Sequence, residues 1–169
     1  MTTNSSAIQD KTYRILSGHA EAQEAIDNVI GRAGHILRAF DHDDLGGRGF
    51  NGVARDATLR KFLMADRINE MRIVLHETGR LERDCPRLLN LLREHPVAIK
   101  IHRATGVALQ ANDPFIIADD AHFWHQLHYQ HPRSVLSLDS TIDAKPMLER
   151  FEEIWLSSEV AVSASTIGL

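Results

Sequence analysis

The sequence predicts an α/β domain, in which a mixed, mainly parallel sheet carries helices on both faces. Some segments place apolar residues at helical spacing, whereas others alternate apolar and polar residues or form short apolar runs typical of strands. The two kinds of segment follow one another along most of the chain, which is the pattern of βαβ units and a parallel sheet. Near the end, two strands follow each other without a helix, so we expect the sheet to be mixed.

Length and composition fit one globular domain. The chain has 169 residues, of which 43% are apolar and 25% are charged. Its formal net charge of −4 lacks the basic footprint of a nucleic-acid-binding protein, so nucleic acid is not expected as a partner. No run approaches the roughly 20 apolar residues of a membrane span, so no membrane partner is expected. Cys85, the single cysteine, is expected to be buried and favours a cytoplasmic location.

The first elements follow a polar segment. Residues 1–11 contain no apolar stretch of the kind that secretory signals carry, and we expect a disordered lead-in. Residues 12–16 are expected to form a strand, which Ser17 and Gly18 end. A helix is expected over residues 19–32, because its alanines, valine and isoleucines recur at helical spacing. The alternation of residues 35–40 predicts the next strand.

The middle of the chain continues the alternation of helix and strand. Leucines and a phenylalanine at helical spacing predict a helix over residues 53–66. The near-continuous apolar run at residues 70–76 is typical of a strand that is covered on both faces. A leucine-rich stripe predicts a third helix over residues 81–92, with Thr78 as its N-cap and Pro96 as its end.

The last third is expected to hold several strands before a final helix. Residues 97–102 alternate, residues 107–111 read as a short strand, and residues 115–118 form a buried strand. A tight turn should then return residues 122–129 antiparallel to it.

The final helix sets the expected end of the domain. A core stripe of methionine, leucine, phenylalanine, isoleucine and tryptophan predicts a helix over residues 143–158. We therefore expect one domain over residues 12–158 and a flexible tail over residues 159–169.

The element order and one strand carry a family resemblance. Together with the buried strand at residues 115–118, which ends in Asp119, the order resembles one half of a phospholipase D-type protein. That family carries the signature His, any residue, Lys, four residues and Asp. The strand aligns Asn112 with the family's nucleophilic His, Pro114 with its Lys and Asp119 with its Asp. The chain is also similar to an uncharacterised group of short bacterial proteins built on this fold.

The resemblance implies a degenerate, non-catalytic member of that fold. The family's reaction needs an imidazole that attacks phosphorus and cations that face the phosphoryl oxygens. Asn112 is neither a nucleophile nor a base in this role, and Pro114 has no charge. Full-length members place two halves face to face, so the resemblance also implies a homodimer of this half-length chain, through the sheet edge or the cleft face.

A ligand-binding rim is expected beyond the carboxyl ends of the parallel strands. Polar and ionisable residues end or follow several strands, and the candidate ligand-binding residues are Asp41, His42, Asp43, Arg48, His76, His102, Asn112 and Asp119. Carboxylates close to histidines suit a metal site or acid–base chemistry. The alternative is a solvated acidic loop in which Asp41 or Asp44 caps the following turn, because Asp is common in loops for local hydrogen bonding.

The glycine-rich loop that carries Arg48 has two interpretations. Gly46, Gly47 and Gly49 lie between a strand and a helix, where backbone N–H groups can cradle a phosphate. The loop matches neither the dinucleotide fingerprint nor a P-loop. We therefore favour a flexible connector.

Histidines recur three residues apart at His122, His125, His128 and His131. On a helix they would share a slowly drifting face and could hold zinc or nickel. On a strand, His122 and His128 would face one way and the other two the opposite way. The neighbouring aromatic residues favour a strand, so His122, His125 and His128 are weak metal candidates and no cofactor is expected.

Three functions stay open at this point. The first is a non-catalytic binding or interaction protein, the second a divergent hydrolase, with or without a metal, that uses the rim of aspartates and histidines. The third is a nucleic-acid accessory protein, suggested only by the substrate class of the family. We favour the first, because the resemblance leaves no nucleophile where the family's reaction needs one.

Overall fold

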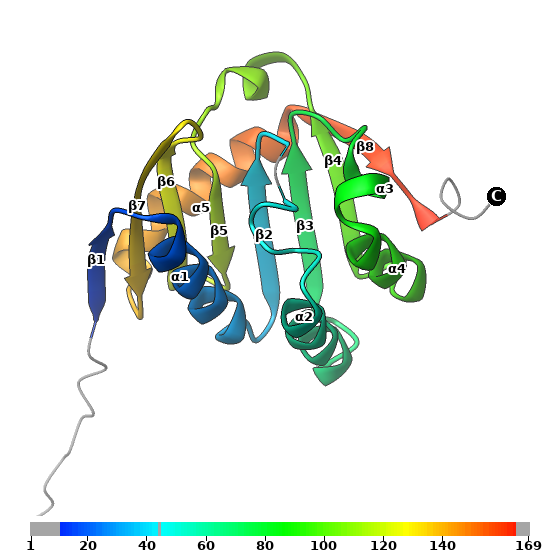
Figure 1. The fold of residues 1–169 in the computed structure, drawn as a ribbon, viewed down its shortest axis with the longest axis horizontal. Coiled ribbons are helices and arrows are strands. Elements are labelled where there is room, and N and C mark those ends of the chain that lie inside the picture. Colours follow the sequence, from blue (N-terminus) through cyan, green and yellow to red (C-terminus); the bar gives the residue numbers. More distant parts are fainter. Residues whose placement is uncertain (1–10, 44, 165–169) are drawn as a thin grey trace, which may run out of the picture.

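The computed structural model describes residues 11–43 and 45–164, which form one eight-stranded sheet with helices around it (Figure 1). The strands are β1 Thr12–Leu16, β2 Ile36–Asp41, β3 Glu70–Leu75, β4 Ile99–Ala104, β5 Phe115–Ala118, β6 His122–His128, β7 His131–Leu138 and β8 Ser158–Val162. The helices are α1 His19–Gly31, α2 Val53–Ala65, α3 Leu81–Asp84, α4 Pro86–Glu94 and α5 Thr141–Leu156, with a 3-10 turn η1 at Gly106–Gln110. No helix among the described residues is long and apolar enough to cross a membrane.

The sheet is mixed, with strand order β1-β7-β6-β5-β2-β3-β4-β8. Two neighbouring pairs, β2–β3 and β3–β4, are parallel. The other five pairs are antiparallel: β5, β6 and β7 form a meander on one side of β2, β1 pairs with β7 at its outer edge, and β8 returns beside β4. The predicted α/β class and mixed sheet are confirmed, but the sheet holds more antiparallel than parallel pairs.

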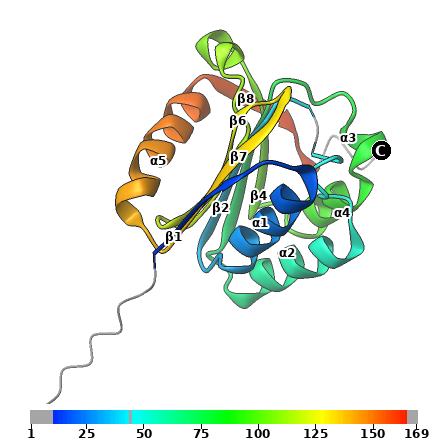
Figure 2. The same ribbon diagram turned by 60° about the vertical axis from the view of Figure 1, so that its left-hand side comes forward.

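Helices cover both faces of the sheet, as predicted. Helices α1 to α4 lie on one face and α5 crosses the other, which the edge-on view shows clearly (Figure 2). The larger core, which includes Ile26, Leu59 and Trp124, packs on the α1 side. A smaller core, built around Phe115 and Phe151, lies between the sheet and α5. We name the two faces the α1 face and the α5 face.

The predicted third helix is broken into two at Cys85. The ring of Pro86 disfavours helical geometry for the residue before it, and Cys85 has φ −136° and ψ 51°. The N-cap of α3 is Arg80 and not Thr78, whose backbone carbonyl instead accepts from the Leu81 N–H. Cys85 is fully buried, as predicted.

Three further segments differ from the prediction. Residues 107–111 do not form a strand: η1 begins after Thr105 with Gly106 at φ +49°, and only Ala108 of its apolar residues is buried. Strand β7 was not predicted, because buried serines interrupt its apolar pattern. The predicted tail is wrong at its start, since Ser158–Val162 pairs with β4 as an edge strand. Residues 165–169, like lead-in residues 1–10, lie outside the described part of the chain.

Candidate functional site

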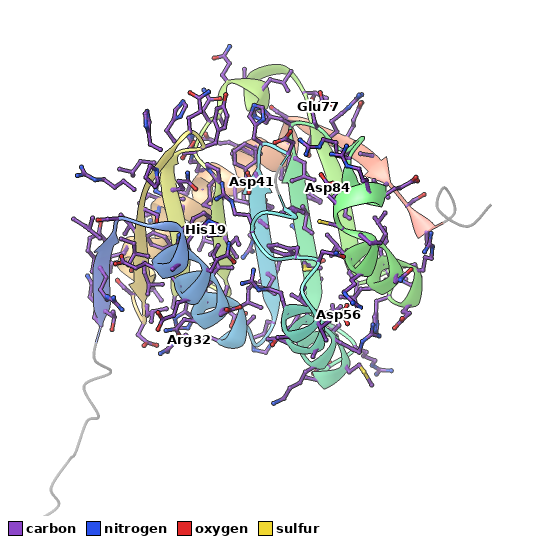
Figure 3. The ribbon with its side chains drawn as sticks, viewed as in Figure 1. His19, Arg32, Asp41, Asp56, Glu77 and Asp84 are labelled. Atoms are coloured by element: carbon purple, nitrogen blue, oxygen red, sulfur yellow. The ribbon has the colours of Figure 1, made fainter. Side chains whose placement is uncertain are left out.

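The carboxyl ends of the parallel strands meet at one edge of the sheet, where Asp41 ends β2 (Figure 3). His76 follows β3 at the same edge. The turn between β6 and β7 reaches the same edge. Strand β5 runs antiparallel to β2 and pairs Phe115 with Phe40, and β6 then runs back toward this edge. We call this edge the rim. Tyr129, which the sequence analysis did not single out, enters the rim from this turn.

Asp41 and Arg48 form a nearly buried ion pair at the rim. Arg48 Nε donates to Asp41 Oδ2 at 2.8 Å, with the two side chains 12% and 4% exposed. The other carboxylate oxygen accepts from the backbone N–H of His42 at 2.7 Å. The Arg48 guanidinium also lies over the indole of Trp124, 5.2 Å from the ring centroid. Asp41 therefore orients Arg48, and it is not free to act as a general base.

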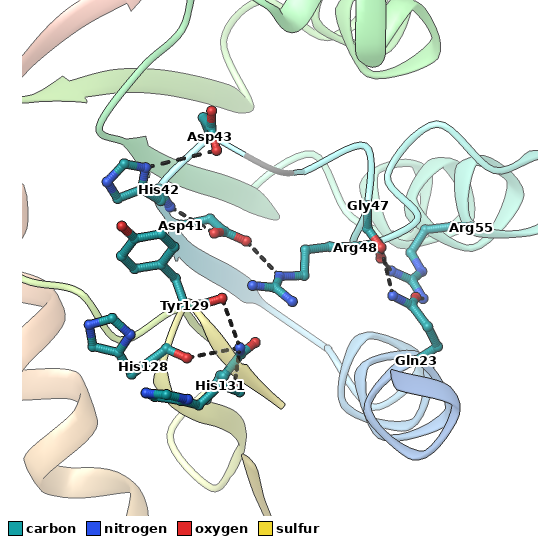
Figure 4. A network of polar contacts seen from close by, with 11 residues as sticks. Gln23, Asp41, His42, Asp43, Gly47, Arg48, Arg55, His128, Tyr129 and His131 are labelled. Atoms are coloured by element: carbon teal, nitrogen blue, oxygen red, sulfur yellow. Dashed lines mark hydrogen bonds and ion pairs between the residues drawn. The ribbon is translucent and has the colours of Figure 1, made fainter. Parts of the chain in front are cut away.

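The loop that carries Arg48 is anchored from two helices. Gln23 Nε2 on α1 donates to Gly47 O at 2.9 Å, and Arg55 on α2 donates to the backbone carbonyl of Arg48 (Figure 4). Arg55 is itself held by Asp27 at 2.7 Å. Gly49 has φ +84°, and a Cβ there would lie 3.1 Å from Gln23 Oε1. The interpretation as a flexible connector is wrong, because the loop is fixed at both its backbone and its arginine.

The phosphate-cradle interpretation of the glycine loop also receives no support from its last residues. The N–H groups of Gly49 and Phe50 donate within the loop, to Gly46 O and Leu45 O. These two N–H groups are occupied within the loop and do not cradle an anion.

Aromatic rings contact one another in a row along the rim. The His42 ring lies 4.5 Å from His76 on one side and 4.4 Å from Tyr129 on the other, and His128 follows 4.9 Å beyond Tyr129. Gln126 fixes the turn beneath them, because its Nε2 donates to the backbone carbonyls of His128, Tyr129 and His131.

His76 is a buried member of this row. Its Nε2 lies 3.2 Å from Ala108 O. Burial lowers the pKa of His76, and the neighbouring His42 lowers it further. His76 is therefore neutral at pH 7, in contact with a backbone carbonyl, and packs the rim rather than presenting a charge to a ligand.

Two pockets open on either side of Arg48. The first, about 280 Å³ in volume, contains the two aspartates of the rim and is lined by Asp41, His42, Asp43, Arg48, Arg80 and Tyr129. We call it the acidic pocket. The second, about 230 Å³, has no carboxylate in its lining, which is formed by His19, Ala22, Arg48, Gln126, Tyr129, Gln130, His131 and Pro132. We call it the basic pocket. Arg48 and Tyr129 belong to both.

The structure brings together five of the predicted site residues: Asp41, His42, Asp43, Arg48 and His76. Asp44 lies outside the described residues. His102 is elsewhere, on the α5 face, where its Nδ1 lies 2.9 Å from Ser158 Oγ and its ring stacks 3.8 Å from that of Trp155. Burial, with Lys100 and Arg72 nearby, lowers the pKa of His102.

Asn112 and Asp119 lie at opposite ends of β5. The Asn112 carbonyl accepts from the N–H of Tyr129 at 2.8 Å, while its exposed amide donates to Gln110 O. Asp119 is at the edge opposite the rim, because Ala118 pairs with Leu37 near the start of β2. There its carboxylate accepts three backbone N–H groups, those of Gly34, His35 and Ile36. Only Asn112 is near the rim.

The predicted strand is confirmed for His122, His125 and His128, which lie on β6 and are separated by it, whereas His131 begins the next strand, β7. His122 Nδ1 accepts from the backbone N–H of Asp139, His125 pairs with Asp113, and His128 lies in the rim row. Within residues 11–43 and 45–164, no three His, Cys, Asp or Glu side chains are grouped so that they could hold a metal ion.

A charged network on the α5 face was missed in the sequence. His125 Nε2 lies 2.8 Å from Asp113 Oδ2, and Arg150 of α5 donates to the other oxygen. Burial would raise the pKa of Asp113, but the hydrogen bonds from His125 and Arg150 outweigh it and hold that pKa below its ordinary value. This network ties α5 to β6. The three residues are far apart in the sequence, so no local pattern announces it.

Comparison with known proteins gives a family and a fold. Residues 18–164 match the family model described as Domain of unknown function (DUF7931). Comparison with curated protein sequences finds no match.

Solved structures share the fold at low identity. Nuc from Salmonella typhimurium, a phospholipase D family member, superposes with a TM-score of 0.65 at 15% identity over 91% of this chain and 100% of its own. NucT from Helicobacter pylori gives 0.62 at 12% identity over 90% of this chain and 100% of its own. TrmBL2, an archaeal chromatin protein, gives 0.64 at 15% identity over 91% of this chain, which spans only 56% of it. The fold is therefore phospholipase D-like.

Proposed function

This chain belongs to the DUF7931 family, and we propose that it is a non-catalytic phospholipase D-like domain that binds a ligand at the rim. One observation carries the proposal. The two positions that the family resemblance assigns to the nucleophilic His and the phosphate-binding Lys hold Asn112 and Pro114. Asn112 turns its amide to Gln110 O, and the buried Pro114 gives its carbonyl to the Gln126 N–H. Neither side chain supplies a nucleophile or a positive charge.

The geometry of the rim supports binding over hydrolysis. A hydrolase that used the rim would need a free carboxylate or imidazole as its base. Asp41 is held by Arg48 and by the His42 N–H, and His76 faces the carbonyl of Ala108. What the rim does offer is two pockets and a fixed arginine between them. These are features of a binding site.

We expect no phosphodiester hydrolysis by the purified chain. Bis(4-nitrophenyl) phosphate should be turned over no faster than in buffer, with or without added zinc, nickel or magnesium, because no nucleophile faces a cation at Asn112 and Pro114. Release of 4-nitrophenol is the measurement. Asn112→Ala and His76→Ala serve as controls. Turnover by the wild-type chain that either substitution abolishes would contradict the proposal.

We also propose that the chain forms a homodimer through the edge of β1. In the described part of the chain, β1 is an edge strand that pairs with β7 on one side only. Two of its apolar side chains, Tyr13 and Ile15, are 56% and 67% exposed. Exposed apolar edge strands pair readily with another strand, and proteins that stay monomeric commonly place lysine there.

The dimer has a direct test in Ile15→Lys. Sedimentation velocity at micromolar concentration should show a dimer for the wild-type chain and a monomer for this variant, because a buried lysine at a strand-to-strand interface opposes pairing. Ile68→Lys is the matched control, since Ile68 is 70% exposed but follows α2, away from β1. A monomeric wild-type chain, or an Ile15→Lys variant that stays dimeric, would rule out this interface.

Nucleic acid is not the ligand that we propose. DNA binding is stated for TrmBL2, but the present chain has a net charge of −4 and carries Asp41 and Asp43 in one of its two rim pockets. Affinity for nucleic acid depends mainly on cations that neutralise phosphates. A cytoplasmic location, which the single cysteine favours, is part of the proposal.

A further inference from the structure

We infer that the basic pocket binds a phosphate group, with the terminal nitrogens of Arg48 as its principal donors. The inference rests on the proposed binding function and names the chemistry of its ligand. It concerns Arg48, His19 and His131, which the family signature does not include. Three features support it: the orientation of Arg48, the composition of the pocket walls, and two buried polar groups on the same face of the sheet that have no partner among the described residues.

The guanidinium of Arg48 is fixed in an orientation that suits the binding of an anion. Its Nε is bound to Asp41, its guanidinium lies over the Trp124 ring, and its backbone carbonyl accepts from Arg55. Among the described residues, Asp41 is the only hydrogen-bond partner of the Arg48 side chain, which leaves the two terminal nitrogens for a ligand. A guanidinium fixed in this way presents a planar fork that matches the oxygens of phosphate, and little side-chain freedom is lost on binding.

The walls of the basic pocket favour a negative ligand over a positive one. Its lining contains Arg48 and two histidines, His19 from the first turn of α1 and His131 from the start of β7, and no carboxylate. His19 and Ala22 place the first turn of α1 at this pocket, and a helix N-terminus adds a partial positive charge. The acidic pocket, by contrast, holds Asp41 and Asp43, whose charges oppose an anion. An anion therefore prefers the basic side of Arg48.

Two buried polar groups lie on the same face of the sheet as the pocket. Trp124 Nε1 and Ser134 Oγ have no hydrogen-bond partner within the described residues, and both residues are 0% exposed. Ser134 pairs with Gln126, which lines the pocket, and Trp124 lies beneath Arg48. An indole N–H is a donor only, so what this region lacks is an acceptor. A ligand rich in oxygen atoms, directly or through a bound water, supplies one.

The arrangement fits phosphate better than carboxylate. A carboxylate is planar and uses little beyond the arginine fork. Phosphate is tetrahedral, so its remaining oxygens can meet donors from the other walls, where His19, Gln130 and His131 are found. The pocket of about 230 Å³ holds a phosphate together with a small part of the molecule that carries it.

Amide chemical-shift mapping tests the inference directly. The probes are inorganic phosphate, glycerol 3-phosphate as a monoester and a short oligothymidylate as a diester, with acetate at matched ionic strength as the carboxylate control. Phosphate and the monoester should shift amides in residues 18–22, 46–49 and 129–131, and acetate should not. Arg48→Lys should weaken phosphate binding at least about tenfold, because the bidentate contact is lost.

Two variants make the result specific. His131→Ala, at an exposed position, should weaken binding with the fold intact, and it covers the case in which Arg48→Lys is unstable. Arg80→Gln is the matched control, since Arg80 lines only the acidic pocket, and it should bind phosphate as the wild type does.

Several results would overturn the inference: no shifts with any phosphate probe, equal shifts with acetate, or binding that Arg48→Lys and His131→Ala leave unchanged. Shifts with oligothymidylate as well as the monoester would support the site and extend it to diesters. These measurements detect binding and not hydrolysis. A failure of the phosphate site would therefore leave the proposed non-catalytic domain untouched. Only the appearance of hydrolysis would contradict that proposal.

Discussion

Replacing Arg48 with methionine is expected to lower the free energy of unfolding by about 3 kcal/mol. Methionine keeps the packing of the side-chain stem on Trp124 but removes the charge. Asp41, whose side chain is 4% exposed, then loses the cation that neutralises it in the interior, while the His42 N–H still donates to it. An unpaired buried charge costs more than the pair itself contributes. Urea denaturation followed by tryptophan fluorescence measures the change.

A double variant separates this explanation from a general loss of packing. Asp41→Asn/Arg48→Met removes both charges together, so no buried carboxylate stays unpaired. We expect it to recover much of the stability that Arg48→Met loses, with a coupling free energy of about 1–3 kcal/mol between the two sites. Additive losses would show that the ion pair does not determine the effect.

A surface arginine provides the matched control. Arg83 on α3 is 69% exposed and pairs with Asp84 in solvent, so its replacement by methionine should leave the free energy of unfolding close to that of the wild type. The contrast between Arg48 and Arg83 tests whether burial of the ion pair, rather than the loss of an arginine, determines the result.

Local periodicity was sufficient for most of the fold. The first strand and α1 needed only the spacing of their apolar residues, and the buried run at β3 was equally clear. Strand β7 escaped because Ser134 and Ser137, both fully buried, break its apolar pattern. Burial of such serines depends on neighbouring strands that no local window contains.

Strand direction was the property that the local pattern could not supply. The run at residues 115–118 was recognisable as a buried strand, but whether it runs parallel or antiparallel to β2 depends on pairing across more than 70 residues of chain. Its antiparallel direction places Asn112 near the rim and Asp119 at the far edge. Strand direction therefore separates Asn112 from Asp119, whereas His102, on the parallel strand β4, is apart from the rim because its ring packs against Trp155 of α5.

Only some of the residues that form the rim could be predicted from the sequence. Asp41, Arg48 and His76 follow strands, and the rule for open α/β sheets brings them together. Tyr129 and Gln126 come from an antiparallel hairpin, and Trp124 contacts Arg48 only through the folded sheet. No rule that relates site residues to the ends of parallel strands applies to these three residues. The basic pocket, which two of them line, could therefore not be predicted from the sequence.

Replacing Asp119 is expected to have the second large effect, on the residue that the resemblance aligns with the signature Asp. Its carboxylate accepts from the backbone N–H groups of Gly34 at 2.8 Å, His35 at 2.8 Å and Ile36 at 3.0 Å, and so fixes the entry into β2. Asp119→Ala should lower the free energy of unfolding by about 3 kcal/mol, because three backbone donors lose their acceptor. Phosphate binding at the rim should not change.

Backbone strain must be separated from the loss of these acceptors. Asp119 has φ +53°, a conformation that glycine adopts freely, asparagine tolerates and alanine does not. Asp119→Gly loses the acceptors without the strain, and Asp119→Asn keeps the conformation and one acceptor oxygen. The expected order of stability is wild type, Asn, Gly and Ala. A glycine variant as stable as the wild type would show that the hydrogen bonds contribute nothing.

The same carboxylate predicts a dependence of stability on pH. Burial would raise the pKa of Asp119, but the three N–H groups outweigh it, so the folded-state pKa lies below the ordinary value. A lowered pKa means that the ionised form stabilises the fold. This contribution is complete above the unfolded-state pKa of about 3.9 and is lost as the pH falls through the folded-state value. Unfolding of the wild type and of Asp119→Asn at pH 7 and pH 3 should therefore show a stability difference that shrinks in acid. A difference that stays constant would mean that the ionised carboxylate is not what holds the start of β2.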